Sequence, residues 1–148
     1  MKIYLDNCCY NRPFDDQTQD RIHLESEAVL AVLKRRLQNK DIIIGSKVVE
    51  LEIGNISNKE KKEKVLALYQ IIDYSEQYTE AILKRAQEIL RTSNIRRLDA
   101  LHVASAESAK ADVMLTTDDK LEKACNRLGL RLRVVNPLKY IMEVMQYE

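Results

Sequence analysis

Short apolar, β-branched runs alternate with longer helical segments along most of the chain, and this alternation constrains the fold more than any other feature. A compact apolar run that stops at a turn residue is typical of a buried parallel strand. Strands joined by helices form parallel sheets with right-handed crossovers. We therefore predict an α/β fold, namely a three-layer α/β/α sandwich with a central, mainly parallel sheet. The expected strands cover residues 2–5, 41–44, 71–72, 112–116 and 132–135.

The segments between these strands have the periodicity of helices. Residues 18–39 place apolar side chains at roughly helical spacing, with charges on the opposite face. Residues 98–110 are apolar nearly all round, which indicates a buried helix. Ser46 and Asp118 stand where N-caps are expected, and Gly129 stands where a C-cap is expected. Further helices are predicted at 46–53, 59–68, 76–91, 120–128 and from 136 onward, and a turn-rich loop is predicted at 6–16.

Length and charge set broad limits on the chain. Its 148 residues include only 3 Gly and 2 Pro, and no repeat, linker or low-complexity tract divides them. This length can bury one core, so we predict a single domain over residues 1–148. The formal net charge of +1 argues neither for nor against nucleic acid. Proteins that bind a phosphate backbone by charge alone are usually more basic, so contact with RNA would need a local patch or a metal.

The apolar segments and the cysteines predict a cytoplasmic protein without a membrane partner. The apolar run at the N-terminus ends at Asp6, which is too early for a signal peptide. No apolar stretch is long enough to span a bilayer. The three cysteines, of which Cys8 and Cys9 are adjacent, do not suggest a disulfide framework or a zinc site.

Four acidic residues fall where an open parallel sheet binds ligands, beyond the carboxyl ends of its strands. Asp6 directly follows the first strand, and Asp118 follows the strand at 112–116. Glu52 and Asp99 lie in the early turns of predicted helices. Each residue alone has an ordinary explanation as a turn former, a cap or a solvated helix residue.

Asp99 is the least ordinary of the four, because it interrupts an otherwise apolar run. A buried carboxylate needs hydrogen-bond donors or a cation, and the cation could be Arg96, Arg97 or a metal. Several carboxylates gathered at one place would repel one another unless some were protonated or a cation were bound. Carboxylate oxygens suit Mg²⁺ or Mn²⁺, and such an ion can activate water for attack on a phosphodiester. His102 is expected to be a hydrogen-bonded core residue.

Four segments, taken in order, resemble the PIN domain family, which includes the VapC-type toxin ribonucleases of prokaryotic toxin–antitoxin pairs. Residues 3–6 look like the family's opening strand with its first metal-binding Asp, and residues 46–52 look like its Ser-initiated helix with a conserved Glu. Residues 97–104 are similar to its Leu-Asp-Ala-x-x-x-Ala helix, and residues 115–118 to its Thr-x-Asp motif. The resemblance covers most of the chain, and the two C-terminal motifs are the most specific.

The resemblance implies a metal-dependent endoribonuclease, a phosphodiesterase that hydrolyses single-stranded RNA as the toxin of a toxin–antitoxin pair. Its expected cofactor is Mg²⁺ or Mn²⁺, as one or two ions. Its expected partners are the RNA substrate, a cognate antitoxin protein and a second copy of the chain in a homodimer. The expected catalytic residues, which are also the metal ligands, are Asp6, Glu52, Asp99 and Asp118.

Two of these positions have a neighbouring alternative. Spacing from Ser46 favours Glu52, whereas a Glu-Leu-x-x-Gly pattern would favour Glu50. The Thr-x-Asp spacing favours Asp118 over Asp119.

Substrate contacts and rival functions also stay open. The polar residues after the first strand could touch substrate or form a hydrogen-bonded loop; they are Asn7, Asn11 and Arg12. A non-catalytic binding or assembly module with the same fold is the main alternative function. A phosphoacceptor receiver domain is disfavoured, because Asp6 is followed by Asn7 and no Lys ends the strand at 132–135.

Overall fold

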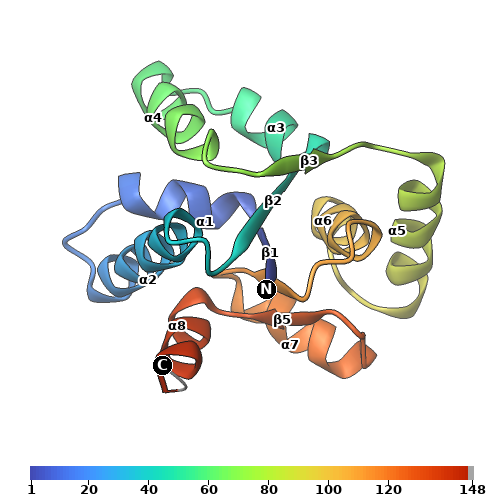
Figure 1. Cartoon of the computed structure of the whole chain (residues 1–148). Helices are drawn as coiled ribbons and strands as arrows, with labels where there is room; N and C mark the ends of the chain where they lie inside the picture. The colour runs from blue at the N-terminus through green and yellow to red at the C-terminus, as the bar shows by residue number, and fades with distance from the viewer. Residues whose placement is uncertain (147–148) are drawn as a thin grey trace.

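The computed structural model describes residues 1–146 and is built around a five-stranded, all-parallel sheet (Figure 1). The strand order is β3-β2-β1-β4-β5, so the first strand of the chain lies at the centre. The three apolar residues of β1 from Ile3 to Leu5 are fully buried, as expected for a strand covered on both faces. The strands are β1 (Lys2–Leu5), β2 (Ile42–Ser46), β3 (Tyr74–Glu76), β4 (Val113–Leu115) and β5 (Arg133–Val135).

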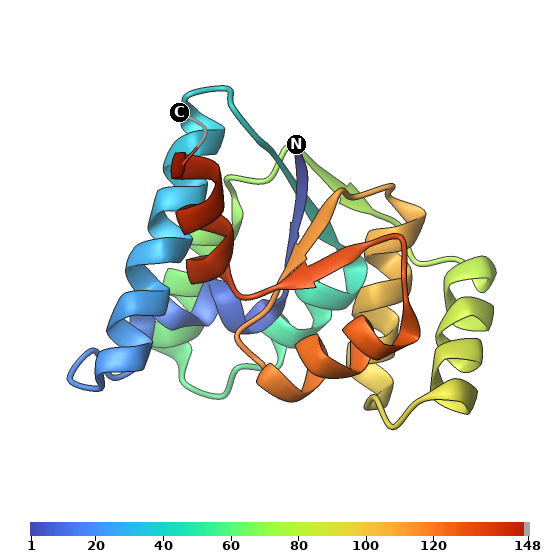
Figure 2. The same cartoon turned by 90° about the horizontal axis from the view of Figure 1, so that it is seen from below.

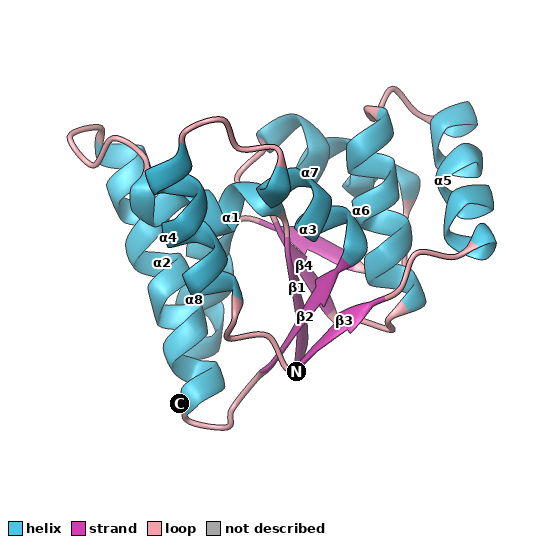
Figure 3. Cartoon of the chain, turned by 90° about the horizontal axis from the view of Figure 1, so that it is seen from above, coloured by secondary structure: helices cyan, strands magenta, loops and turns pink. Residues whose placement is uncertain are grey.

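Helices cover both faces of the sheet, which confirms the α/β prediction (Figure 2). In the views from above and below, α2, α4 and α8 lie on one side of the strands, and α5 and α6 lie on the other (Figure 3). The helices are α1 (Asn7–Asn11), the 3-10 helix η1 (Arg12–Phe14), α2 (Asp20–Leu37), α3 (Lys47–Gly54), α4 (Lys59–Tyr69), α5 (Glu80–Thr92), α6 (Arg97–Ser108), α7 (Asp119–Leu128) and α8 (Pro137–Gln146).

The predicted helix ends are confirmed at three positions. The Ser46 hydroxyl accepts a hydrogen bond from the Val49 N–H at the start of α3. The Asp118 carboxylate accepts from two backbone N–H groups in the first turn of α7. Gly129 has a φ of +64° after α7, a left-handed conformation that glycine adopts without steric cost.

The predicted strand at 71–72 is wrong, because these residues form a turn after α4. The backbone N–H of Ile72 donates to Tyr69 O at 3.2 Å and so continues the last turn of the helix. The chain joins the sheet only beyond Asp73, whose carboxylate accepts from the Ile43 N–H at 2.9 Å. The strand is therefore β3, shifted by a few residues and at the edge of the sheet.

Two other segments differ from the prediction. The helix expected at 76–91 begins only at Glu80, after an N-cap in which the Thr79 hydroxyl accepts from the Ile82 N–H. Tyr78, which falls within that expected range, lies before the helix and is exposed. The loop expected at 6–16 contains α1 and η1. No helix within residues 1–146 is long and apolar enough to cross a membrane.

Candidate metal centre

Asp6 is fixed at the carboxyl end of the two central strands. Its backbone N–H donates to Leu115 O at 3.0 Å, which extends the pairing of β1 with β4 by one residue. The side chain is buried, and its Oδ2 accepts a hydrogen bond from Thr116 Oγ1 at 2.9 Å. Thr116 Oγ1 also accepts from the Asp118 N–H at 3.2 Å. The Thr of the Thr-x-Asp motif therefore connects the first and the last of the four predicted acids.

Helix α3 brings Glu52 towards this strand end and turns Glu50 away from it. The two residues are about 200° apart around the helix, so they face different neighbours. Glu50 accepts hydrogen bonds from the Tyr69 hydroxyl at 2.8 Å and from the Ser75 hydroxyl at 2.5 Å. Glu52 instead forms a hydrogen bond with His102 Nε2. The structure thus brings Glu52, and not Glu50, to the side of Asp6.

His102 holds Glu52 through a buried chain of hydrogen bonds that begins at the N-cap of α3. The Tyr4 hydroxyl lies 2.7 Å from Ser46 Oγ and 2.7 Å from His102 Nδ1. With a neutral imidazole, Ser46 donates to Tyr4, Tyr4 donates to Nδ1, and Nε2 donates to Glu52. Each group then accepts one hydrogen bond and donates one, as buried polar groups require.

His102 also faces Asp6, with 3.5 Å between Nε2 and Asp6 Oδ1. Burial by itself would lower the pKa of His102, but the charge of Asp6 and the hydrogen bond to Glu52 outweigh burial and raise the pKa. The ligand atoms of Asp6, Glu52 and His102 all lie within 4.8 Å of one another. Sequence reasoning correctly placed His102 in the core but missed its contact with the acids. The available signal was its position three residues after Asp99 on the same helix.

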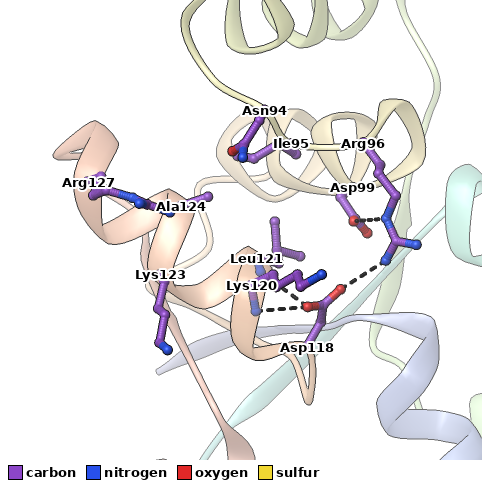
Figure 4. Close-up of a pocket in the computed structure, with 10 residues that line it drawn as sticks. All are labelled: Asn94, Ile95, Arg96, Asp99, Asp118, Lys120, Leu121, Lys123, Ala124 and Arg127. Carbon is purple, nitrogen blue, oxygen red and sulfur yellow. Dashed lines mark hydrogen bonds and ion pairs between the residues drawn. The ribbon is translucent and has the colours of Figure 1, made fainter.

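Asp99 and Asp118 form a second pair, which is bridged by Arg96 (Figure 4). Arg96 Nε lies 3.4 Å from Asp99 Oδ2, and Arg96 Nη2 lies 3.0 Å from Asp118 Oδ2. Burial raises the pKa of Asp99, the charge of Asp6 raises it further, and Arg96 partly opposes both effects. Asp119 points elsewhere, since both of its carboxylate oxygens bind Arg21, at 2.6 and 2.8 Å.

The polar residues of α1 and η1 have separate roles in this arrangement. Asn7 Nδ2 donates to Glu52 Oε2 at 3.5 Å, so Asn7 borders the cluster. Asn11 Nδ2 donates to the Asn7 carbonyl at 2.9 Å and supports the short helix. Arg12 binds Glu25 at 3.0 Å and Asp15 at 3.1 Å, so its charge is already compensated.

The donor groups at this strand end fit a hard divalent cation. Asp6 and Glu52 supply carboxylate oxygens, which Mg²⁺ and Mn²⁺ prefer, and Asp99 and Asp118 add two more carboxylates nearby. Thr116 and His102 orient the first two carboxylates, as outer residues commonly do around metals. In the protein alone, Arg96 supplies positive charge to Asp99 and Asp118, and His102 forms a hydrogen bond with Glu52.

Comparison with known proteins agrees with this architecture. A model of the PIN domain family matches residues 21–126, which is more than two thirds of the chain. The chain belongs to the PIN domain family. The matched range of this PIN domain contains Glu52, Asp99 and Asp118, whereas Asp6 precedes it. No curated protein matches the sequence.

Solved structures share the fold at low sequence identity. One chain from the crystal structure of VapBC2 from Rickettsia felis, bound to a DNA fragment from their promoter, is similar with a TM-score of 0.62 and 16% identity. The likeness covers 90% of this PIN domain chain and 98% of the other. At this identity it shows the fold alone.

Proposed function

We propose that this PIN domain protein is an endoribonuclease that uses Mg²⁺ or Mn²⁺ to hydrolyse single-stranded RNA. The observation that carries the proposal is the convergence of Asp6 and Glu52, held by Thr116 and His102, at the carboxyl end of the central strands. A divalent cation bound between these carboxylates would relieve the repulsion that remains beside His102 and Arg96.

The four acids would share the work of holding one or two ions. Asp6 and Glu52 are the oriented ligands, and Asp99 and Asp118 complete the site once Arg96 releases them. A bound divalent ion would supply Lewis acidity towards the phosphate and an activated water as nucleophile. In the protein without metal, burial and the charge of Asp6 raise the pKa of Asp99, and a bound divalent ion would favour its ionised form.

The biological role that we propose is that of a toxin paired with an antitoxin protein in the cytoplasm, with homodimers as the working form. Membership of the PIN domain family and the shared fold with a chain of the VapBC2 complex support an antitoxin partner. All three cysteines are free thiols, which suits a reducing compartment. A small basic or DNA-binding protein encoded immediately upstream would support the pairing.

The test is a cleavage assay on mixed single-stranded RNA, with protein stripped by EDTA and then titrated with Mg²⁺ or Mn²⁺. We expect no cleavage without metal and saturable cleavage with it. Glu52→Gln should lower the rate roughly a thousandfold, because loss of a ligand removes several kcal/mol of transition-state stabilisation. Glu50→Gln, two residues away on the same helix, is the matched control and should keep nearly full activity.

Two results would contradict the proposal. One is equal loss of cleavage in both variants while their melting curves stay intact, because Glu50 does not face the cluster. The other is a parent protein that binds metal yet cuts none of a broad set of RNAs. That second result would favour a non-catalytic binding or assembly module.

A further inference from the structure

A cavity of about 440 Å³ opens beside the acids, between the start of α6 and the exposed face of α7 (Figure 4). Asp99, Asp118 and Arg96 line the end nearest the acidic cluster. The cavity extends away from them along α7 towards Arg127, and its size is within the range of small-ligand pockets. A ligand bound in this cavity would therefore lie next to Asp99 and Asp118 of the proposed metal centre.

The floor of this cavity is apolar and rigid. Ile95, Leu121 and Ala124 form it, and each is less than a tenth exposed. The loop that carries Ile95 is held in place, because the Ser93 hydroxyl donates to Ile89 O at 2.7 Å and accepts from the Ile95 N–H at 3.3 Å. A flat apolar group can pack on such a floor without rearrangement of the backbone.

The rim of the cavity is cationic and carries one amide. Lys120 and Arg127 are both exposed and seven residues apart, which places them on one face of α7. Neither forms an ion pair with a carboxylate anywhere in residues 1–146, so their charge is available to a ligand. The Asn94 amide, on the opposite rim, makes no hydrogen bond to another described residue and offers both a donor and an acceptor.

We infer that this cavity binds one nucleotide of a single-stranded RNA, with the base on the apolar floor and the adjoining phosphates on Lys120 and Arg127. A nucleotide combines a flat apolar face, a polar edge and a negative backbone, and the cavity presents a partner for each. Phosphates would be repelled by the four acids, whereas the cations of α7 attract them to the edge of the acidic cluster. Asn94 is placed to read the edge of the base. The inference rests on the proposed function for the choice of RNA.

The test measures binding without cleavage, by fluorescence anisotropy of a labelled mixed-sequence RNA 12-mer in EDTA over a series of salt concentrations. The double variant Lys120→Ala, Arg127→Ala should bind roughly tenfold more weakly, and the slope of log affinity against log salt should fall by about 1.4, or about 0.7 for each lost phosphate contact on a single strand. The matched control is Lys84→Ala, Arg91→Ala, with the same residue types and spacing on exposed positions of α5. The control should keep the parent slope.

A second variant separates base reading from charge. Asn94→Ala should leave the salt slope unchanged and reduce the differences in affinity among oligo(A), oligo(C) and oligo(U). Equal slopes for the parent and the α7 double variant would overturn the inference, even if the protein cleaves RNA. Displacement of the RNA by a polyglutamate peptide of equal charge would overturn it in favour of an acidic peptide. The two proposals can fail separately. If the protein cleaves no RNA but the salt slope falls only in the α7 double variant, the proposed function is contradicted and the RNA-binding cavity is supported.

Discussion

The two halves of the acidic cluster are held in different ways. Asp6 and Glu52 are oriented by uncharged or internally paired groups, namely the Thr116 hydroxyl and the buried imidazole of His102. Asp99 and Asp118 are instead held by Arg96, whose side chain is 80% exposed. The first half joins the end of β1 to helix α3, and the second lies beside a cavity.

This difference indicates a division of labour. The half formed by Asp6 and Glu52 is preorganised, so it should bind a cation with little rearrangement. The half formed by Asp99 and Asp118 already has a cation of its own in Arg96, which must move before a metal or a substrate phosphate can take its place. Changes in the Asp6–Glu52 half should therefore weaken metal binding, whereas removal of Arg96 should strengthen it.

Thr116→Val provides the largest expected effect on metal affinity among the variants that keep all four acids. Valine has the shape of threonine but cannot donate to Asp6, so the carboxylate loses its orientation. Loss of such an outer contact typically weakens metal binding roughly 10- to 100-fold. Thr117→Val is the control, because that buried neighbour makes no side-chain hydrogen bond to another described residue. Equal Mn²⁺ affinities for the two variants would show that the Asp6–Glu52 half is not preorganised by Thr116.

Arg96→Ala should have a smaller effect of opposite sign. Without the guanidinium, Asp99 and Asp118 repel each other more strongly, and a divalent cation relieves that repulsion. We expect Mg²⁺ to bind severalfold more tightly, as measured by the metal-induced rise in melting temperature. Arg97→Ala, at the next position, removes the same charge type without touching the acids. A decrease in affinity for Arg96→Ala would break the proposed division between the two halves.

Asp99→Asn should change how the stability of the metal-free protein depends on pH. The folded pKa of Asp99 is raised above its ordinary value of 3.8, so folding favours the protonated form. The stability that Asp99 contributes is fully present when the pH is below the ordinary pKa of 3.8, and it is lost as the pH rises through the folded pKa. The melting temperature of the variant, measured in EDTA between pH 3.5 and 7, should therefore rise relative to that of the parent as the pH increases. A difference in melting temperature that stays constant across this pH range would show that the neighbours of Asp99 do not raise its pKa.

Much of the fold could be predicted from local sequence. Compact apolar runs located β1, β2, β4 and β5, and the caps Ser46, Asp118 and Gly129 located helix ends. The spacing from Ser46 in the family resemblance favoured Glu52 over Glu50, and the structure places Glu52 beside Asp6 and His102.

The remaining features depend on contacts between distant segments. Ile71 and Ile72 read as a strand because they are apolar and β-branched, but Asp73 decides where the chain meets β2. The contact of His102 with Glu52 joins residues fifty positions apart, and no local pattern encodes it. Arg96 could be proposed as a partner of Asp99 from their spacing, but its second contact with Asp118 requires the packing of α6 near the start of α7.

The most direct test of the central claim is a calorimetric titration of EDTA-stripped protein with Mn²⁺, for the parent and for Asp6→Asn. The asparagine matches the carboxylate in size, so the variant should stay folded, but it is a poorer ligand and removes one negative charge from the Asp6–Glu52 half. We predict saturable binding by the parent and no measurable binding by Asp6→Asn at the same concentrations. Equal binding of Mn²⁺ by both proteins, or no binding by a correctly folded parent, would contradict the assignment of these acids as a metal centre.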